Sequence, residues 1–422
     1  MILAMPILAI TTGQTILYSL IVFLIIILLL VSLLIFAKDK LSPKGKVRLQ
    51  LNNRELDVNP GSNLLSTLSG NGIFLPSACG GGGTCGLCRC QIEEGGGSIL
   101  PTETGFFSRK EQQEKWRLSC QVKIREDLKV KVPESVLGIK KFTCEVVSNR
   151  NVATFIKELV VKMPEGVDLE FEPGGYIQID VPKYEAGFRD IFVEGNFRSD
   201  WDKFKMWDLS IKNNEESFRA YSMANFPAEK NLIKLNIRIA TPPWDRVKND
   251  FLNVPPGLCS TYIFTRKPGD KISLSGPYGE FHIKNTSAEM IYIGGGAGMA
   301  PLRSHIFHLF KTLKTTRKVS FWYGARSTRE VFYEDEFRAI EKEFPNFSFH
   351  LALSEPLPED NWTGYTGFIH KVLLDNYLSK HDEPEDIEYY FCGPPMMNGA
   401  VIKMLDNLGV PKDNISFDDF GI

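Results

Sequence analysis

Three cysteines lie close together in a segment that is otherwise almost entirely glycine. Five residues separate Cys79 from Cys85, two separate Cys85 from Cys88, and Cys120 follows after a helical segment. Four thiolates can hold an iron–sulfur cluster, and glycines let the chain wrap around it because they adopt positive φ angles at little cost. The N–H groups of such a loop can also donate hydrogen bonds to cluster sulfurs. The spacing predicts a [2Fe–2S] site with ligands Cys79, Cys85, Cys88 and Cys120.

A structural zinc site is the competing interpretation of these cysteines. Structural zinc usually draws on paired C-x2-C knuckles, whereas only Cys85 and Cys88 form such a pair here. Cys90 lies two residues after Cys88 on the same strand face, so we expect a buried neighbour and not a ligand. The other thiols, Cys144, Cys259 and Cys392, are scattered, which favours a reducing compartment over a disulfide framework.

A second glycine-rich loop has the character of a phosphate site. The apolar run Met290–Ile293 leads into Gly294-Gly295-Gly296-Ala297-Gly298-Met299-Ala300-Pro301, and a helical stretch follows. The bare N–H groups and the dipole at a helix N-terminus favour a bound phosphate. The G-x-G-x-x-P spacing of Gly296, Gly298 and Pro301 differs from the G-x-G-x-x-G fingerprint and is weak alone. Three later segments strengthen it: 323–327, 352–355 and 391–397.

An R-x-Y-S segment, Arg219-Ala220-Tyr221-Ser222, suits a flavin. Strand alternation places Arg219 and Tyr221 on one face. The ring could stack on an isoalloxazine while the guanidinium pairs with a pyrophosphate. A further segment, 257–261, supplies small residues and hydroxyls that let the backbone approach phosphate closely, namely Gly257, Cys259, Ser260 and Thr261. Alone, R-x-Y-S also describes an ordinary strand.

The element that precedes these sites is a long apolar run. Residues Ile16 to Phe36 carry no charge, and as a helix they extend roughly 31 Å, about the thickness of a bilayer core. A signal peptide would need a basic leader and a small-residue cleavage site, which the sequence lacks. Basic residues follow at 38–48, so the positive-inside rule places the N-terminus outside and the remainder in the cytoplasm.

Length and periodicity divide the chain into an anchor and three domains. We expect an anchor at 1–37, an α+β cluster domain at 38–137, an antiparallel β-barrel at 138–284 and a parallel α/β domain at 285–422. The net charge of −2 over 422 residues gives no footprint for nucleic acid. An insertion at 183–217, rich in aromatic and charged residues, is either a surface addition without a role or a docking surface for partner subunits.

The ordered motifs resemble two known families. The cluster domain resembles a plant-type ferredoxin, with C-x5-C-x2-C in place of C-x4-C-x2-C, and the two later domains resemble the ferredoxin-NADP reductase family. The resemblance implies that Ser222 lies near flavin N5 and that Phe420 shields the flavin face opposite Tyr221. It also implies that Arg219 and Ser260 hold the pyrophosphate, and that Cys392, Gly393 and Pro394 lie beside the nicotinamide.

The choice between NADH and NADPH is expected at Ser354-Glu355. Members of that family that use NADPH commonly have Ser-Arg there, so that a guanidinium holds the 2′-phosphate. A carboxylate at Glu355 would repel that phosphate and accept hydrogen bonds from ribose hydroxyls. NADH is therefore the expected substrate. Arg326 and Arg329 are the alternative cations for a phosphate.

The anchor and these domains together closely resemble the F subunits of the sodium-translocating NADH:quinone reductases. That resemblance implies hydride transfer from NADH to FAD, single-electron transfer to a [2Fe–2S] cluster, and export to other membrane subunits. It also implies a bacterial inner-membrane protein, anchored in the lipid bilayer by a single pass, with its soluble domains in the cytoplasm. One anchor helix makes no ion path, so sodium translocation would belong to the partners.

Two other functions compete with this interpretation. The reductase component of a multicomponent oxygenase shares the three soluble domains, but the anchor and the five-residue spacer disfavour it. A membrane-tethered, metal-stapled scaffold without catalysis is disfavoured by the two nucleotide-binding signatures. We expect Tyr221, Ser222, Cys392 and Phe420 to be the residues nearest the hydride.

Overall fold

The computed structural model describes residues 12–41, 45–245 and 247–419. Two compact units make up the chain: residues up to Thr67 with Cys90–Val132, and Leu68–Arg89 with Pro133 onward. Helix α1 (Thr12–Leu41) contains the apolar run, and its segment Gly13–Ala37 is long and apolar enough to cross a membrane. The side chains of 13–36 are exposed, as expected for a helix that meets lipid.

The first unit is built on a five-stranded mixed sheet of order β2-β1-β5-β3-β4. Strands β1 (Val47–Leu51) and β2 (Arg54–Val58) form the expected hairpin, with Asn52 at a φ of 50° in the turn. Strand β5 (Leu128–Lys131) is parallel to β1 and antiparallel to β3 (Arg89–Glu94). The remaining elements are α2 (Leu64–Gly70), α3 (Arg109–Gln113) and β4 (Trp116–Leu118). Leu49, Leu51 and Val130 form part of the core.

The second unit begins with an antiparallel barrel. Its sheet has the order β11-β8-β15-β6-β7-β12, and a bridge between Met223 and Leu235 joins the two outer strands. The strands are β6 (Lys140–Ala153), β7 (Ile156–Lys162), β8 (Tyr176–Val181), β11 (Ser217–Ser222), β12 (Leu232–Arg238) and β15 (Lys271–Tyr278). Helix α6 (Leu258–Phe264) packs into its core. Short elements complete this part: α4 (Glu134–Leu137), β13 (Trp244–Asp245) and β14 (Asp250–Phe251).

The insertion at 183–217 folds back onto the barrel. It forms β9 (Tyr184–Gly187), α5 (Arg198–Lys203) and β10 (Ser210–Asn213) with short 3-10 turns between them. Phe188 and Trp201 are fully buried, and Trp201 Nε1 donates to the carbonyl of Thr154 at 2.8 Å. Contrary to expectation, these two residues are therefore not part of a docking surface of exposed aromatics. Phe192, at 66% exposure, is an exception.

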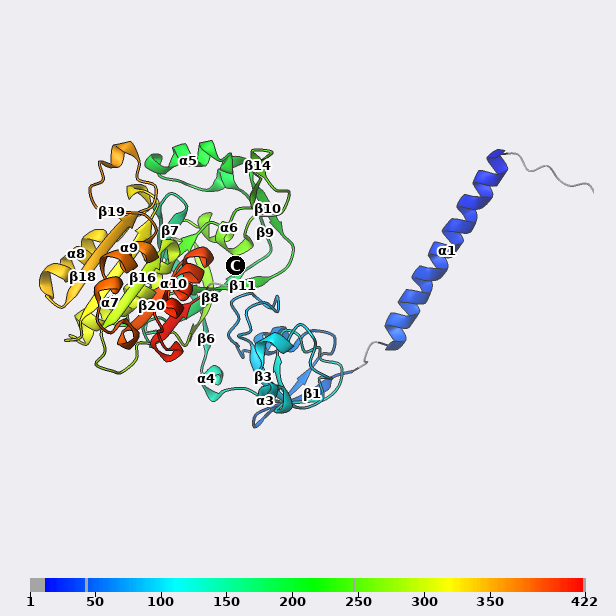
Figure 1. Ribbon diagram of the computed structural model, residues 1–422. Helices are drawn as coiled ribbons and strands as arrows, with labels where there is room; N and C mark the ends of the chain where they lie inside the picture. The colour runs from blue at the N-terminus through cyan, green and yellow to red at the C-terminus, as the bar shows by residue number, and fades with distance from the viewer. Residues whose placement is uncertain (1–11, 42–44, 246, 420–422) are drawn as a thin grey trace, which may run out of the picture. The chain divides into compact units, whose positions relative to one another are not determined.

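A six-stranded parallel sheet forms the last part of the second unit, in the order β19-β18-β17-β16-β20-β21. Its strands are β16 (Met290–Gly295), β17 (Val319–Ala325), β18 (Phe347–Leu353), β19 (Tyr365–Thr366), β20 (Glu388–Cys392) and β21 (Ile415–Asp418). Strands β16, β18, β19 and β20 are labelled in Figure 1. Helices α7 (Met299–Phe307) and α8 (Glu334–Glu343) cover one face, and α9 (Ile369–Asn376) and α10 (Pro395–Asn407) cover the other. The order reverses between β16 and β20, which is where such folds bind ligands.

The fold class expected from the sequence is confirmed in each of its parts. An N-terminal apolar helix precedes a ferredoxin-like α+β sheet, an antiparallel barrel and a parallel α/β sheet. The boundaries 1–37, 38–137, 138–284 and 285–422 stay a prediction.

Candidate cofactor and nucleotide sites

The cysteine loop has the tight, glycine-dependent backbone that its composition predicts. Gly80, Gly81, Gly83 and Gly86 all have positive φ angles, between 65° and 91°. Cys85 Sγ donates to Cys79 Sγ at 3.3 Å, and this hydrogen bond lowers the pKa of the Cys79 thiol. A loop with this backbone and these soft donors fits an iron–sulfur cluster.

The other cysteines of this region are placed as follows. Cys88 is 1% exposed, and Cys120 belongs to the first unit and is buried. Cys90 is also buried, with its Sγ 3.8 Å from the carbonyl of Arg117, as expected for a core neighbour. Within the described residues, no three metal-binding side chains lie together at ligating distance. The complete set of four ligands therefore stays a prediction.

The R-x-Y-S strand and helix α6 meet inside the barrel. Tyr221 pairs with Ile177 of β8, and its phenol approaches the thiol of Cys259 on α6. Burial, together with this thiol, raises the pKa of Tyr221 well above its usual value. Arg219 is turned toward its own strand, because its Nη1 donates to Ser217 Oγ at 3.0 Å and to the carbonyl of Phe218 at 2.7 Å. The structure thus brings Arg219, Tyr221 and Cys259 together.

The turn before α6 is shaped for a close backbone approach. A Cβ on Gly257 would lie 2.6 Å from Ala240 Cβ and 2.8 Å from Ser260 Oγ. Ser260 Oγ accepts from the N–H of Ala240 and donates to the carbonyl of Gly257, both at 3.1 Å, so its hydroxyl holds the turn. Thr261 Oγ1 is buried and has no hydrogen-bond partner among the described residues. A buried hydroxyl of this kind, in the first turn of a helix, fits a phosphate-bearing cofactor.

Ser222 reaches a carboxylate that sequence reasoning did not assign to the site. Its Oγ donates to Asp418 Oδ2 at 2.8 Å, although the two residues are 196 positions apart. Asp418 ends β21 and pairs with Cys392 of β20, which is fully buried. The only signal in the sequence was the position of Asp418 next to the predicted C-terminal aromatic. That aromatic, Phe420, lies outside the described residues.

Asp418→Asn should weaken the dependence of the free energy of unfolding on pH. Burial raises the pKa of Asp418 to about 6, although the hydrogen bond from Ser222 opposes the shift. The folded state then holds a proton that the unfolded state releases, so the free energy of unfolding falls as pH rises from about 4 to about 6. The free energy of unfolding of the variant relative to wild type should be higher at pH 7.5 than at pH 4 by about 2 kcal/mol, because a pKa raised from 3.8 to about 6 corresponds to roughly that energy. Thermal melts at both pH values measure this, and an equal difference at both would contradict it.

The nucleotide loop and the C-G-P-P segment meet at the carboxyl ends of β16 and β20. Gly294 pairs with Cys392, and a Cβ on Gly298 would lie only 2.0 Å from the Cys392 carbonyl oxygen and 2.7 Å from Gly393 N. Gly296 has a φ of 56°, and Pro301 lies in the first turns of α7. Glycine at 298 lets the loop lie directly against the Cys392 segment, and the loop leads into the N-terminal end of α7, which fits a nucleotide pyrophosphate. The structure therefore brings Gly296, Gly298, Cys392 and Gly393 together.

The predicted specificity residues occupy neighbouring strand ends. Ser354 N donates to the carbonyl of Ala325 at 2.9 Å, and Glu355 N to that of Arg326 at 2.8 Å. The Arg326 guanidinium pairs with Glu330 at 3.3 Å. Arg329 is held by Asp200 at 3.3 Å and Glu359 at 3.1 Å. Both alternative arginines thus already have carboxylate partners, which weakens them as 2′-phosphate ligands.

Three protein families match consecutive parts of the chain. Residues 47–125 match the 2Fe-2S iron-sulfur cluster binding domain, residues 203–283 the oxidoreductase FAD-binding domain, and residues 292–403 the oxidoreductase NAD-binding domain. The cofactors expected from the sequence, a [2Fe–2S] cluster and FAD, with NADH as substrate, are therefore confirmed at the level of the domains.

Relatives cover nearly the whole chain. It is 54% identical to the F subunit of the Na(+)-translocating NADH-quinone reductase of Pseudomonas aeruginosa, over 92% of this chain and 95% of that one. The Klebsiella pneumoniae and Neisseria gonorrhoeae proteins of the same name are each 53% identical, over 96% of this chain and 99% of theirs.

Among solved structures, a ferredoxin reductase of carbazole 1,9a-dioxygenase is 25% identical with a TM-score of 0.58, covering 89% and 98% of the two chains. The Amycolatopsis cytochrome P450 reductase GcoB has a TM-score of 0.62 at 22% identity, covering 89% and 98%. The sequence relatives decide the family: this chain belongs to the F subunits of the Na(+)-translocating NADH-quinone reductases.

Proposed function

We propose that this chain is the electron-input subunit of a sodium-translocating NADH:quinone oxidoreductase. It oxidises NADH and passes the electrons singly to partner subunits in the membrane. One observation carries the proposal: the nucleotide loop, the C-G-P-P segment and the R-x-Y-S strand converge through the contacts of Gly298 with Cys392 and of Ser222 with Asp418. Bound FAD would supply a carrier that can take two electrons together and release them singly, which a one-electron [2Fe–2S] carrier requires.

The side chains of the second unit bind and orient the reactants. The N-terminal end of α7 receives the NADH pyrophosphate at Gly296, Gly298 and Pro301, and Arg326, Ser354 and Glu355 receive the adenosine ribose. Cys392, Gly393 and Pro394 would place the nicotinamide, and Tyr221 and Ser222 would confine the flavin ring; the role expected for Phe420 lies outside the described residues. Arg219, Gly257, Cys259, Ser260 and Thr261 hold its phosphates. Positioning is the main contribution of these groups, because hydride transfer needs no acid–base dyad.

The cysteine loop packs against the flavin strand within the second unit. Gln178 Nε2 on β8 donates to the carbonyl of Leu75 at 3.1 Å, and a Cβ on Gly80 would lie 2.1 Å from Arg219 Nη1. Lys141 Nζ lies 5.0 Å from the centre of the Phe74 ring. Contact between this loop and the R-x-Y-S strand supports electron export through Cys79, Cys85, Cys88 and Cys120.

The location proposed for the chain is the bacterial inner membrane. Helix α1 crosses the lipid bilayer once, with the N-terminus outside and the residues after 37 in the cytoplasm. The partners are the other membrane subunits of the complex. This proposal rests on the apolar helix and on the basic residues that follow it.

A visible spectrum of the purified chain tests the proposed function. Flavin bands and broad iron–sulfur absorption should both bleach on addition of NADH, and the chain should co-purify with integral membrane subunits. If NADH does not bleach the cofactor bands, the chain does not oxidise NADH, and a scaffold without catalysis would be the remaining interpretation. Transfer of electrons to a soluble oxygenase, without membrane subunits, would instead identify the oxygenase reductase alternative.

Glu355→Arg should shift the substrate preference toward NADPH. The carboxylate repels a 2′-phosphate, whereas a guanidinium pairs with it, so a gain of roughly tenfold or more in kcat/KM for NADPH is expected. NADH turnover should fall only through KM. Steady-state kinetics with both nucleotides measure this, with the exposed residue variant Glu383→Arg as the control. A variant with no NADPH activity would show that Glu355 does not discriminate.

A further inference from the structure

Arg303 on α7 is an almost completely buried arginine whose hydrogen bonds are all satisfied. It is 2% exposed. Nε and Nη2 donate to Glu336 Oε2 at 2.9 and 2.7 Å, and Nη1 and Nη2 donate to the two Glu229 carboxylate oxygens at 2.9 and 3.3 Å. Nη1 also donates to the carbonyl of Ala224 at 2.8 Å. The five N–H donors of the guanidinium match these five contacts.

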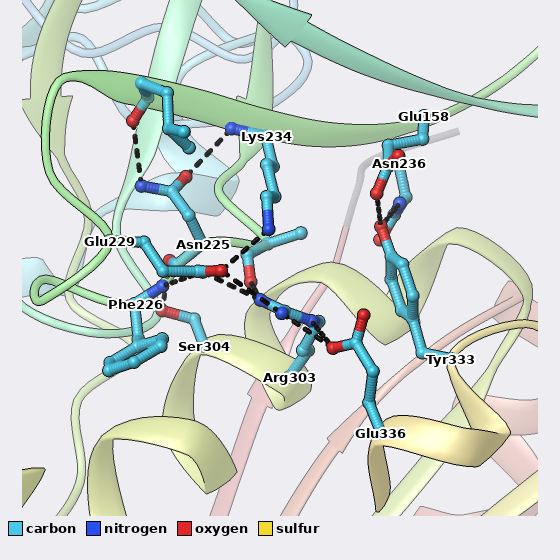
Figure 2. Close-up of polar contacts among 12 residues, drawn as sticks. Glu158, Asn225, Phe226, Glu229, Lys234, Asn236, Arg303, Ser304, Tyr333 and Glu336 are labelled. Atoms are coloured by element: carbon cyan, nitrogen blue, oxygen red, sulfur yellow. Dashed lines mark hydrogen bonds and ion pairs between the residues drawn. The ribbon is translucent and has the colours of Figure 1, made fainter. Parts of the chain in front are cut away.

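These partners come from two different parts of the second unit (Figure 2). Ala224 and Glu229 lie between β11 and β12 of the barrel, and Glu336 lies on α8 of the parallel α/β part. The guanidinium carbon of Arg303 is 4.1 Å from the Phe307 ring centre and 5.2 Å from that of Tyr333. Hydrogen bonds therefore fix the edges of the guanidinium, and aromatic rings pack against it. Because Ala224 and Glu229 belong to the barrel part, these contacts hold α7 to the barrel.

Neighbouring contacts reinforce the same junction. Ser304 Oγ, one residue along α7, donates to the carbonyl of Asn225 at 2.8 Å. Tyr333 Oη donates to Glu158 Oε2 at 2.6 Å and accepts from Asn236 Nδ2 at 2.8 Å, as Figure 2 shows. Burial would raise the pKa of Glu229, but Arg303 and Lys234 lower it, so this carboxylate stays charged at neutral pH.

The junction lies between the two reacting ends of the site. Ala224 is two residues after Ser222, on the segment that continues the flavin strand. Helix α7 begins directly after Gly298, which lies against Cys392. One guanidinium thus connects the helix that starts at the nucleotide loop to the strand that carries Tyr221 and Ser222.

We propose that Arg303 is a positioning residue that sets the register between the nicotinamide loop and the flavin strand. It thereby fixes the distance over which hydride is transferred. The inference rests on the proposed function and extends it to a residue that touches neither nucleotide. Lysine cannot replace it, because one ammonium group cannot reproduce the planar fork that binds two carboxylates and a carbonyl.

Arg303→Lys in the full-length chain tests the proposal, with Arg317→Lys as the matched control. Arg317 is partly buried, with 10% of its side chain exposed, and it binds Glu388 at 2.6 Å and the carbonyls of Ala288 and Lys284 at 2.6 and 3.1 Å. All these partners follow β15, the last strand of the barrel, so Arg317 does not connect the parallel sheet to a barrel strand. Stopped-flow flavin reduction by NADH and by its 4-deuterated form measures the hydride step, and flavin content and the dissociation constant of NADH are measured in parallel.

Arg303→Lys should slow flavin reduction by about 10- to 100-fold, as expected for a small displacement of reacting groups. The deuterium isotope effect on turnover should rise, while NADH binding and flavin content stay near wild type. Arg317→Lys should leave the rate and the isotope effect unchanged. A near-normal hydride rate in Arg303→Lys, or a loss confined to NADH binding, would overturn the proposal.

Ser304→Ala provides a milder variant if Arg303→Lys does not fold. It removes one bond across the same junction and should slow the hydride step by a few-fold. An unchanged rate and isotope effect would then count against the proposal. A wild-type chain that does not oxidise NADH would show instead that the proposed function is wrong.

Discussion

Replacing Cys85 by alanine should abolish the iron–sulfur absorption and reduce electron export to background, while NADH still reduces an artificial dye at close to the wild-type rate. Cys85 Sγ lies 3.3 Å from Cys79 Sγ in the glycine loop. Loss of the Cys85 thiolate removes one of the ligands that the cluster needs. The residues proposed to bind NADH and FAD lie in the barrel and the parallel α/β part. The flavin half of the reaction should therefore continue without the cluster.

Cys90→Ala is the matched control for this variant. Cys90 lies in the same region and is fully buried, but its Sγ contacts the carbonyl of Arg117. It should keep the cluster spectrum and electron export, with only a modest loss of stability from the small cavity. Visible and electron paramagnetic resonance spectra report the cluster, and dye and quinone reduction separate the two halves of the reaction. Loss of dye reduction in Cys85→Ala, with FAD still bound, would contradict the order of the carriers.

Local patterns in the sequence were sufficient to predict the separate parts of this fold. The expected strand at Val47–Leu51 and its turn at Asn52 are confirmed, because alternation and turn chemistry act over a few residues. The parallel sheet followed from apolar strands that alternate with helices. The phosphate site at Gly294–Gly298 could be predicted because its ligands are backbone N–H groups, and the glycines that expose them are visible in the sequence.

Contacts between distant segments were harder to predict. The hydrogen bond of Ser222 with Asp418 joins the barrel to the last strand, and no local pattern specifies which hydroxyl a carboxylate will meet. The aromatics of the insertion illustrate the same difficulty. Trp201 lies in a segment whose sequence shows little periodicity, so it was expected to be exposed. In the structure it is buried against Phe188 and Phe264. Burial in an irregular segment is decided by tertiary packing, which composition does not encode.

The Arg303 junction also shows this limit. Arg303 follows the glycine motif by a few residues, where an arginine usually indicates solvent exposure. Its burial depends on Glu229 and Glu336, which lie 74 and 33 positions away. A buried charge is tolerated when its partners and hydrogen bonds are complete. The burial of Arg303 therefore depends on the tertiary fold and cannot be predicted from any single segment of the sequence.

Gly298→Ala should slow NADH oxidation by about 100-fold or more, because the added methyl group displaces the loop that places the nicotinamide. Gly298 has a φ of −61°, which alanine adopts without strain. The effect is therefore purely steric: the Cβ would lie 2.0 Å from the Cys392 carbonyl oxygen and 2.3 Å from its carbon. Both are backbone atoms at the end of a buried strand, so the neighbouring segments cannot yield by a side-chain rotation.

Gly399→Ala is the control that isolates this clash. A Cβ at Gly399 meets nothing within 4 Å, and the residue lies inside helix α10. Alanine there should leave the rate unchanged and raise the free energy of unfolding by about 0.5–1 kcal/mol. Stopped-flow reduction by NADH and by dithionite separates the steps, since dithionite bypasses the nucleotide site and should still reduce Gly298→Ala fully. A Gly298→Ala chain that oxidises NADH at a rate close to wild type would mean that the loop and the Cys392 segment separate when nucleotide binds, and that their contact does not position the nicotinamide.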